Sequence, residues 1–546
     1  MNFNGADFRH PFRAGIFRLT VVWLVVAVCF CYVVSRLLWI QVLHPERLLA
    51  EGNARVVRSY NFEPPRGLIT DRNGEILAIS VPVQTVDADP KILHENGVWN
   101  DNEAMHRIAD ILDLDFKELK GKTAEKKRRY VHLKHYLDME KANEVKSLGR
   151  GGILLHDSYR RMYPTGAESA PLIGILNGEG EGVYGIERSF NRYLTSSASA
   201  RLAKKDRFDR IVENISVLKN GTQGGNLMLS VDMRLQSYAY EKLAAAVEEN
   251  QADNGTAVLM SVKTGEILAM VSYPSFDPNE RKSFDSTNAA DRAVTDIFEP
   301  GSTVKPMIAL AALAAGTSDW NKVYDTRPFK VDGKMVRDSH SMDSGTLLDI
   351  IKYSSNTGMA HISMATGPAK SLEQLRRFGF GSRTESGIIG ENDGRLNDKR
   401  KFWSEIDIAT LGFGYGIAVT NLQLTSAYAT MANGGVRVPV SILRLSQKPK
   451  GMPVASYKDV RRMISALETV VAKMAVRGGY GNSYIGTFAG FAPLSDPKFS
   501  MVVVIKNPKA GKFYGGTVAG PVFRDVMSRA LQLYNVAPDR GLDEKN

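Results

Sequence analysis

The chain has 546 residues, of which 43% are hydrophobic and 24% charged, as in a globular protein of more than one domain; this excludes a disordered chain or a multi-span transporter. Its formal charge of +11 suits nucleic acid, anionic lipid or an acidic polymer, but the sequence has no zinc-finger spacing or RNP-like aromatic run, so we expect no nucleic-acid partner. The two cysteines, Cys29 and Cys31, stand in one apolar run, which leaves the rest of the chain without a disulfide or a thiolate metal site.

The first predicted element is a membrane anchor at residues 19–43. Residues 19–35 carry no charge, and a tilt or a snorkelling Arg36 can extend the helix to Leu43. The arginines ahead of this run outnumber its single acid, Asp7, which places the N-terminus in the cytoplasm. No A-x-A-like cleavage site follows, so we interpret the segment as an uncleaved anchor, with a buried core helix as the alternative. The chain after about residue 44 would then lie outside the cytoplasm.

Residues 44–225 are expected to form a β-rich domain. Two apolar runs flank Arg72-Asn73-Gly74, and Asn-Gly is a strong signal for a hairpin. Residues 102–146 show a charged, helical pattern, which predicts exposed helices on a modest core. Residues 153–230 return to short strand-like runs that are separated by turns rich in Gly and Asn.

The character of the sequence changes near residue 225, where we place the domain boundary. A strand and a helix are predicted within 227–250. Further strands are expected at 256–262, 266–272, 485–492 and 499–506, and helices at 304–315, 422–433 and 522–534. Because the strands cluster near the two ends of this region, the pattern indicates an α+β domain whose single sheet is assembled from both ends.

The stretch F-E-P-G-S-T-V-K-P at residues 298–306 carries the first candidate chemistry. An apolar helix is predicted to begin at about Ser302, where a serine can serve simply as a helix cap. Lys305 lies three residues further on, on the same helical face. It can take the proton of the serine only if desolvation or nearby positive charge lowers its pKa. The apolar residues after Lys305 can provide that desolvation, although S-x-x-K alone also arises by chance.

A second candidate stands about 50 residues further on, in Y-S-S-N-T-G. The hydroxyl of Ser354 and the amide of Asn356 can relay a proton and hold a substrate amide. The same letters also favour an ordinary turn or helix start. Each motif is weak alone, but their order and spacing within one α+β domain behind an anchor make the combination specific.

S-x-x-K followed by S-x-N resembles the signature of penicillin-binding proteins and serine β-lactamases. The resemblance extends from about residue 18 to 536. PPRGLITDRNGEILA, RRMYPTG, GVYGIERSFNRYL and KKDRFDR are similar to blocks of the N-terminal domain of class B penicillin-binding proteins. AVLMSVKTGEILAMVSYPSFDPN and FGYGIAVTNLQLTSAYATMANGG are similar to the transpeptidase domain, and the C-terminal region to the division-specific FtsI subgroup.

This resemblance implies four segments. Residues 1–18 would be a cytoplasmic tail, 19–43 the transmembrane anchor, 44–225 a pedestal domain of the penicillin-binding protein dimerisation type, and 226–546 the transpeptidase domain. The transpeptidase domain would have the β-lactamase-like fold, an antiparallel sheet with helices on both sides. The protein would sit in the bacterial inner membrane with most of its chain in the periplasm.

The resemblance also implies an activity, the cross-linking of peptidoglycan stem peptides during septal wall synthesis. Ser302 would form an acyl-enzyme with the penultimate D-Ala, and Lys305 would be the general base. Ser354 and Asn356 would complete the proton relay, and backbone N–H groups, one of them from Ser302, would form the oxyanion hole. β-Lactam antibiotics would acylate the same serine. A membrane-embedded glycan polymerase and other divisome proteins would be partners, and no metal or organic cofactor is implied.

One part of the family pattern is missing. The third family motif, K-[TS]-G, is expected on the strand facing Ser302, where it binds the carboxylate of the substrate. The one K-T-G of this sequence, Lys263-Thr264-Gly265, precedes Ser302 and is predicted to be a hairpin turn. Where the motif belongs, shortly before residues 480–493, Val471 is followed directly by Ala472-Lys473, so that roughly two dozen residues are absent relative to the family pattern.

Two interpretations of this gap stay open: a deletion or sequence fault in an otherwise active enzyme, and a natural non-catalytic relative that serves as a divisome scaffold. Lys473 or Arg477 can replace the charge of the missing lysine, although Arg477-Gly478-Gly479 also fits a turn. For the chain as it stands we predict weak or absent acylation. A β-lactamase is a further rival, but it would be smaller and would need a deacylating water with its own base.

Overall fold

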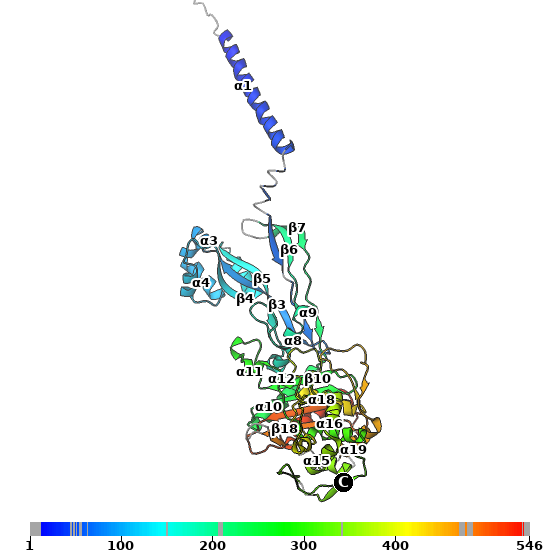
Figure 1. Cartoon of the computed structure of the whole chain (residues 1–546). Coiled ribbons are helices and arrows are strands. Elements are labelled where there is room, and N and C mark those ends of the chain that lie inside the picture. The colour runs from blue at the N-terminus through cyan, green and yellow to red at the C-terminus, as the bar shows by residue number, and fades with distance from the viewer. Residues whose placement is uncertain are drawn as a thin grey trace, which may run out of the picture.

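The computed structural model describes residues 12–43, 46, 50, 52–53, 57–62, 64–148, 151–205, 211–339, 342–468, 475–477, 484–537 and 539. Helix α1 (Phe12–Leu38) and the π-helical turn η1 (Trp39–Leu43) lie at one end of the molecule, apart from the two folded domains (Figure 1). Within the described residues, the segment Ile16–Val42 is the one helix long and apolar enough to cross a membrane, and none of it is buried. This agrees with the predicted anchor, and the protein is membrane-anchored.

The middle domain, which we call the pedestal, contains two sheets. Five strands form the first, in the order β4-β3-β2-β8 with β5 paired to the other edge of β3, and β1-β6-β7 form the second. The strands are β1 (Val57–Phe62), β2 (Ile69–Thr70), β3 (Ile76–Ala88), β4 (Val131–Leu137), β5 (Ile153–Met162), β6 (Ser199–Lys205), β7 (Ile211–Lys219) and β8 (Leu227–Met228). The helices are α3 (Pro90–Glu95), α4 (Asn102–Ile111), α5 (Phe116–Lys122), α6 (Met139–Ser147), α7 (Ala170–Ile173), α8 (Gly185–Ser189) and α9 (Asn191–Leu194).

The prediction of helices throughout 102–146 was wrong for one segment. Val131–Leu137 is strand β4, which pairs antiparallel with β3. Its sequence V-H-L-K-H-Y-L buries Val131, Leu133 and Leu137, so that apolar side chains recur at period two at its start. The expected helices flank it as α4, α5 and α6, and their apolar faces form a core with β3 and β4. The predicted hairpin at Asn73-Gly74 is confirmed, since β2 and β3 pair antiparallel across it.

The C-terminal domain is a five-stranded antiparallel sheet with helices on both faces, in the strand order β10-β9-β19-β18-β17. Its strands are β9 (Asn254–Ser261), β10 (Ile267–Tyr273), β17 (Ala475–Arg477), β18 (Tyr484–Ala492) and β19 (Phe499–Lys506), with short pairs β11 (Val323–Asp325), β12 (Phe329–Val331), β13 (Lys334–Val336), β14 (Ser344–Thr346), β15 (Val436–Arg437) and β16 (Met452–Pro453). Its helices are α10 (Met233–Glu249), α11 (Ser286–Ala289), α12 (Arg292–Thr295), α13 (Lys305–Ala314), α14 (Leu347–Lys352), α15 (Asn356–Thr366), α16 (Pro368–Arg377), α17 (Glu405–Leu411), α18 (Asn421–Ala432), α19 (Tyr457–Glu468), α20 (Gly515–Val518) and α21 (Gly520–Leu533).

The predicted α+β fold, with one sheet from both ends of the domain, is confirmed. β9 pairs with β19 over eight residues although more than 200 residues separate them in the chain. Helices α10 and α21 pack on one face of the sheet around Leu243, Val503 and Val526. Helices α13, α18 and α19 share the core on the other face, around Met307, Leu424 and Val502. Ser302, just before α13, therefore lies on the face of the sheet that α13, α18 and α19 cover.

The pedestal and the C-terminal domain are joined by the turn between β2 and β3. The buried carboxylate of Asp71 accepts hydrogen bonds from the N–H groups of Asn73 and Glu75 within the turn, and from the N–H of Met233, the first residue of α10. A side chain of the pedestal thus caps a helix of the next domain. The division near residue 225 stays a prediction: β8 still pairs with β2 of the pedestal, and α10 packs on the sheet of the C-terminal domain.

Candidate active site

Ser302 lies in a tight 3₁₀ turn, η5 (Gly301–Val304), that leads directly into α13. Its side chain is partly exposed and forms no capping hydrogen bond, so the simple role of a helix cap does not apply within the described structure. Two contacts fix the turn from behind. The hydroxyl of buried Tyr428 donates to the carbonyl of Thr303 at 2.9 Å, and Gly414 lies against Gly301 so closely that a Cβ there would be 2.1 Å from the Gly301 carbonyl oxygen.

Lys305 is the first residue of α13 and is only 2% exposed. Its Nζ donates to Ser354 O at 2.5 Å, to Ser354 Oγ at 3.1 Å and to Asn356 Oδ1 at 2.8 Å. These three acceptors match the three donors of an ammonium group. Burial lowers the pKa of Lys305 to about 7, against an opposing influence of Asp338 that raises it. The predicted desolvation of this lysine is therefore confirmed.

Ser354 owes its orientation to the way α14 ends. The N–H of Ser354 bonds to Ile351 O and the N–H of Ser355 to Ile350 O, which is a Schellman motif. Ser354 occupies the left-handed position with φ +53°, where glycine is usual and other residues pay about 1 kcal/mol or more. This strained backbone turns both the carbonyl and the hydroxyl of Ser354 toward Lys305, which is a reason to keep a serine there.

Asn356 begins α15, and Ser355 caps that helix by accepting from the N–H of Gly358. The ordinary reading of Y-S-S-N-T-G as a helix start is thus correct, and it coexists with the contacts to Lys305. The sequence did not point to Asp338, which lies just beyond β13 and accepts hydrogen bonds from the N–H groups of Asn356 and Thr357 at 2.5 and 2.9 Å. No local motif marks Asp338; an aspartate after a short hairpin carries no signal of its own.

Three of the four candidate residues, Lys305, Ser354 and Asn356, are in direct contact. Ser302 lies three residues before Lys305 in the chain. Among the described residues, its Oγ makes no hydrogen bond with Lys305 Nζ, whose donors bond to Ser354 and Asn356. Catalytic hydrogen bonds are often formed only when substrate is bound. The arrangement can transfer protons between a hydroxyl and a desolvated amine. The described residues include no group of three or more His, Cys, Asp or Glu side chains that could hold a metal ion.

The family resemblance predicts the third motif at the edge of the sheet that lies beside η5. Strand β17 occupies this edge, and its residues Ala475 to Arg477 pair with Gly486 to Tyr484 of β18. The described part of the edge strand therefore reads A-V-R. Lys473 and the junction at Val471 lie outside the described residues. Lys263-Thr264-Gly265 forms the turn between β9 and β10, as predicted, with the N–H of Gly265 bonded to Ser261 O.

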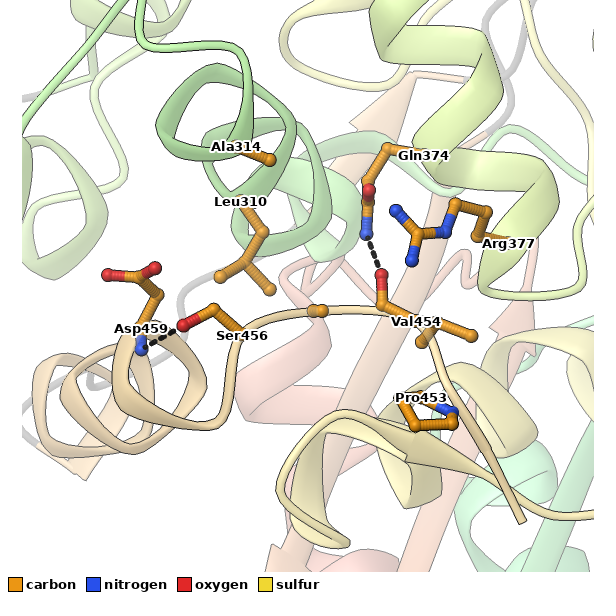
Figure 2. Close-up of a pocket in the computed structure, with 9 residues that line it drawn as sticks. Leu310, Ala314, Gln374, Arg377, Pro453, Val454, Ser456 and Asp459 are labelled. Carbon is orange, nitrogen blue, oxygen red and sulfur yellow. Dashed lines mark hydrogen bonds between the residues drawn. The ribbon is translucent and has the colours of Figure 1, made fainter.

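A small cavity lies at the opposite end of α13 (Figure 2). It has a volume of about 120 Å³ and is lined by Leu310, Ala314, Gln374, Arg377, the segment 453–456 and Asp459. None of the four candidate residues borders it. Gln374 Nε2 donates to the Val454 carbonyl across its wall. The cavity is therefore separate from the four candidate residues.

The fold and this cluster of serine, buried lysine and S-x-N define a penicillin-binding transpeptidase. Residues 255–528 match the penicillin-binding protein transpeptidase domain, and residues 61–229 match the penicillin-binding protein dimerisation domain. The chain belongs to the family of penicillin-binding proteins that combine these two domains.

Individual relatives show which members of this family the chain is similar to. The sequence is 36% identical over 549 residues to the peptidoglycan D,D-transpeptidase FtsI of Escherichia coli (strain K12), covering 95% of this chain and 93% of that one. It is 34% identical to the probable peptidoglycan D,D-transpeptidase PenA of Neisseria gonorrhoeae, covering 96% and 94%. Among solved structures, a peptidoglycan synthetase from Bifidobacterium adolescentis has a TM-score of 0.69 at 24% identity, covering 89% of this chain and 98% of that one, and shares the fold.

Proposed function

We propose that this chain is a serine peptidoglycan D,D-transpeptidase that cross-links stem peptides of the septal wall. The observation that carries the proposal is the buried Lys305, which the structure surrounds with Ser354 and Asn356 and whose pKa burial lowers to about 7. The 36% identity with the FtsI transpeptidase along nearly the whole chain supports the substrate class. The same serine would be acylated by β-lactams, as the name of the family implies.

In this mechanism Ser302 Oγ attacks the carbonyl carbon of the penultimate D-Ala while neutral Lys305 accepts the hydroxyl proton. A neutral amine gives up one of the three donated hydrogen bonds and presents a lone pair in its place. The tetrahedral intermediate collapses as its C–N bond breaks, and the proton returns through Lys305 and Ser354 to the departing D-Ala amine. The backbone N–H of Ser302 would stabilise the oxyanion. The amine of a second stem peptide then attacks the ester, which forms the cross-link and frees the serine.

The membrane anchor also supports a location for the protein in the cell. The anchor would hold the protein in the bacterial inner membrane with its N-terminus in the cytoplasm, and the pedestal and the transpeptidase domain would lie in the periplasm. Stem peptides would be reached there, next to a membrane-embedded glycan polymerase and other divisome proteins. The pedestal would raise the active site above the membrane, as its place between α1 and the C-terminal domain suggests (Figure 1).

Covalent labelling by a fluorescent penicillin tests the proposal. The full chain in detergent should acquire a weak but stable label on the peptide that contains Ser302, and Ser302→Ala should acquire none while keeping the wild-type melting temperature. Rapid release of the label would instead indicate a β-lactamase, and labelling of Ser302→Ala would refute the assignment. Because the edge strand lacks K-T-G, we expect the wild-type chain to label more slowly than a relative with all three motifs.

A further inference from the structure

The carboxylate of Asp338 accepts four hydrogen bonds from residues 355–357, at the start of α15. Its Oδ1 accepts from the N–H groups of Asn356 and Thr357, and its Oδ2 accepts from the hydroxyls of Ser355 and Thr357 at 2.5 and 2.8 Å. Ser355 already caps α15 through Gly358. Ser355 thus satisfies one of the free N–H groups at the start of α15, and Asp338 satisfies two more, those of Asn356 and Thr357, so that its carboxylate fixes where the helix begins.

The geometry fixes which way the Asn356 amide points. Asn356 Nδ2 donates to the carbonyl of Arg337 at 3.3 Å, while Oδ1 faces Lys305 Nζ at 2.8 Å. If the amide were turned over, its NH₂ group would face the donors of the lysine, and both would lose a partner. Arg337 and Asp338 thus hold Asn356 by its side chain and its backbone N–H, and the acceptor is left for Lys305.

The hairpin that carries Asp338 is itself mounted on α15. The ring of Phe329 on β12 stacks on that of His361 on α15, with centroids 4.1 Å apart and planes at 14°. Val331 and Val336 pack with Ala360 in a small separate core. The β12–β13 hairpin and the start of α15 therefore form one rigid unit, which holds the Asp338 carboxylate in a defined place.

The charge of Asp338 reaches the lysine as well. The groups that touch Lys305 Nζ, Ser354 and Asn356, are uncharged. Among the described residues, Asp338 is the ionisable group that acts on Lys305, and it raises the pKa that burial lowers. The neighbouring Arg337 is exposed to solvent and contributes its backbone carbonyl.

We propose that Asp338 is a positioning residue for the proposed acyl transfer: its carboxylate fixes the start of α15 so that the Asn356 amide oxygen faces Lys305, and its negative charge acts on the lysine amine. This inference rests on the proposed function and deepens it. Asp338 touches no substrate; it acts through Asn356 and Lys305. Its charge opposes the loss of basicity that burial imposes on Lys305, and so helps the neutral amine to accept the proton of Ser302.

Asp338→Asn in the full chain tests the charge, and Asp343→Asn is the matched control. Asp343 is exposed and its charge acts on Arg327. The titration of Lys305 is followed by NMR of ¹³Cε-labelled lysine, with the resonance assigned by Lys305→Met. We expect Asp338→Asn to lower the titration midpoint by about one pH unit and Asp343→Asn to leave it unchanged. An unchanged midpoint in a folded Asp338→Asn would overturn the proposal.

A second variant separates geometry from charge and covers the case in which Asp338→Asn does not fold. Asp338→Glu keeps the charge but displaces the carboxylate by one methylene. Its Lys305 midpoint should stay near the wild-type value, and penicillin acylation should slow by about tenfold; wild-type acylation would contradict the positioning role. If the wild-type chain takes up no penicillin at any pH, the proposed function fails, whereas the midpoints of the two asparagine variants still decide the role of Asp338.

Discussion

Glu187 offers a direct test of what holds the pedestal together. Its fully buried carboxylate accepts from Arg66 Nε at 2.7 Å and from Arg161 Nε at 2.8 Å, and these arginine side chains are 8% and 5% exposed. Replacing Glu187 by glutamine would leave two buried guanidinium groups without a counter-charge, and breaking a buried pair from one side costs about 3–5 kcal/mol. Arg161 Nη2 is already buried without a hydrogen bond, and the other acceptors of this guanidinium, Ser80 Oγ and the Arg66 carbonyl, carry no charge.

A loss of this size is large for a domain of the pedestal's length. At about 2–4 °C per kcal/mol, the pedestal transition of Glu187→Gln should fall by roughly 10 °C in calorimetry of the full chain. Glu213→Gln is the control, because the Lys204–Glu213 pair lies on the surface of the same domain, with side chains 42% and 59% exposed, and is worth at most about 1 kcal/mol. Equal shifts in melting temperature for the two variants would contradict the argument that burial makes the Glu187 ion pairs more stabilising than the surface pair.

Other perturbations address the active site and the domain junction. Because Lys305 must be neutral to accept a proton and burial lowers its pKa to about 7, the acylation rate should rise with pH and level off above about 7; a flat profile would speak against its role as the base. Asp71→Ala removes the acceptor for the N–H of Met233 and should cost about 1–3 kcal/mol by urea unfolding, whereas exposed Glu75→Gln should cost almost nothing. Inserting a K-T-G-bearing segment between Val471 and Ala472 should speed penicillin acylation about tenfold or more, and an insert of equal length with A-A-G in its place should not.

The sheet and its helices followed from the sequence because burial imposes a period on each element. β9, β10, β18 and β19 were predicted within a few residues, and so were α13, α18 and α21. The one clear error, β4, arose because its short alternating run stands between charged helices and its partner strand, β3, is remote in the chain. Local pattern cannot show which distant strand a segment will pair with.

Much of the active site was also open to prediction, because the spacing of S-x-x-K places both side chains on one helical face. Three things were not. The left-handed backbone of Ser354 depends on how α14 terminates. The orientation of the Asn356 amide depends on the Arg337 carbonyl. Asp338 reaches the site only because the β12–β13 hairpin packs on α15. Each depends on tertiary contacts that leave no periodic trace in the sequence.

The proposed active site has two halves with separate supports, and this bears on the motif that we predict to be missing. The half that would handle the proton is formed by Lys305, Ser354 and Asn356, and it is held by α14, α15 and the β12–β13 hairpin. The other half would be the edge strand, where the family resemblance predicts the third motif, and here β17 has the described residues A-V-R. The hydrogen bonds of Lys305 run to Ser354 and Asn356, so we expect a change at the edge strand to leave Lys305 in place. The gap that we predict before Ala472 should therefore weaken substrate recognition while the proton-transfer half stays intact, which is why we expect weak acylation at Ser302 and not a collapsed site.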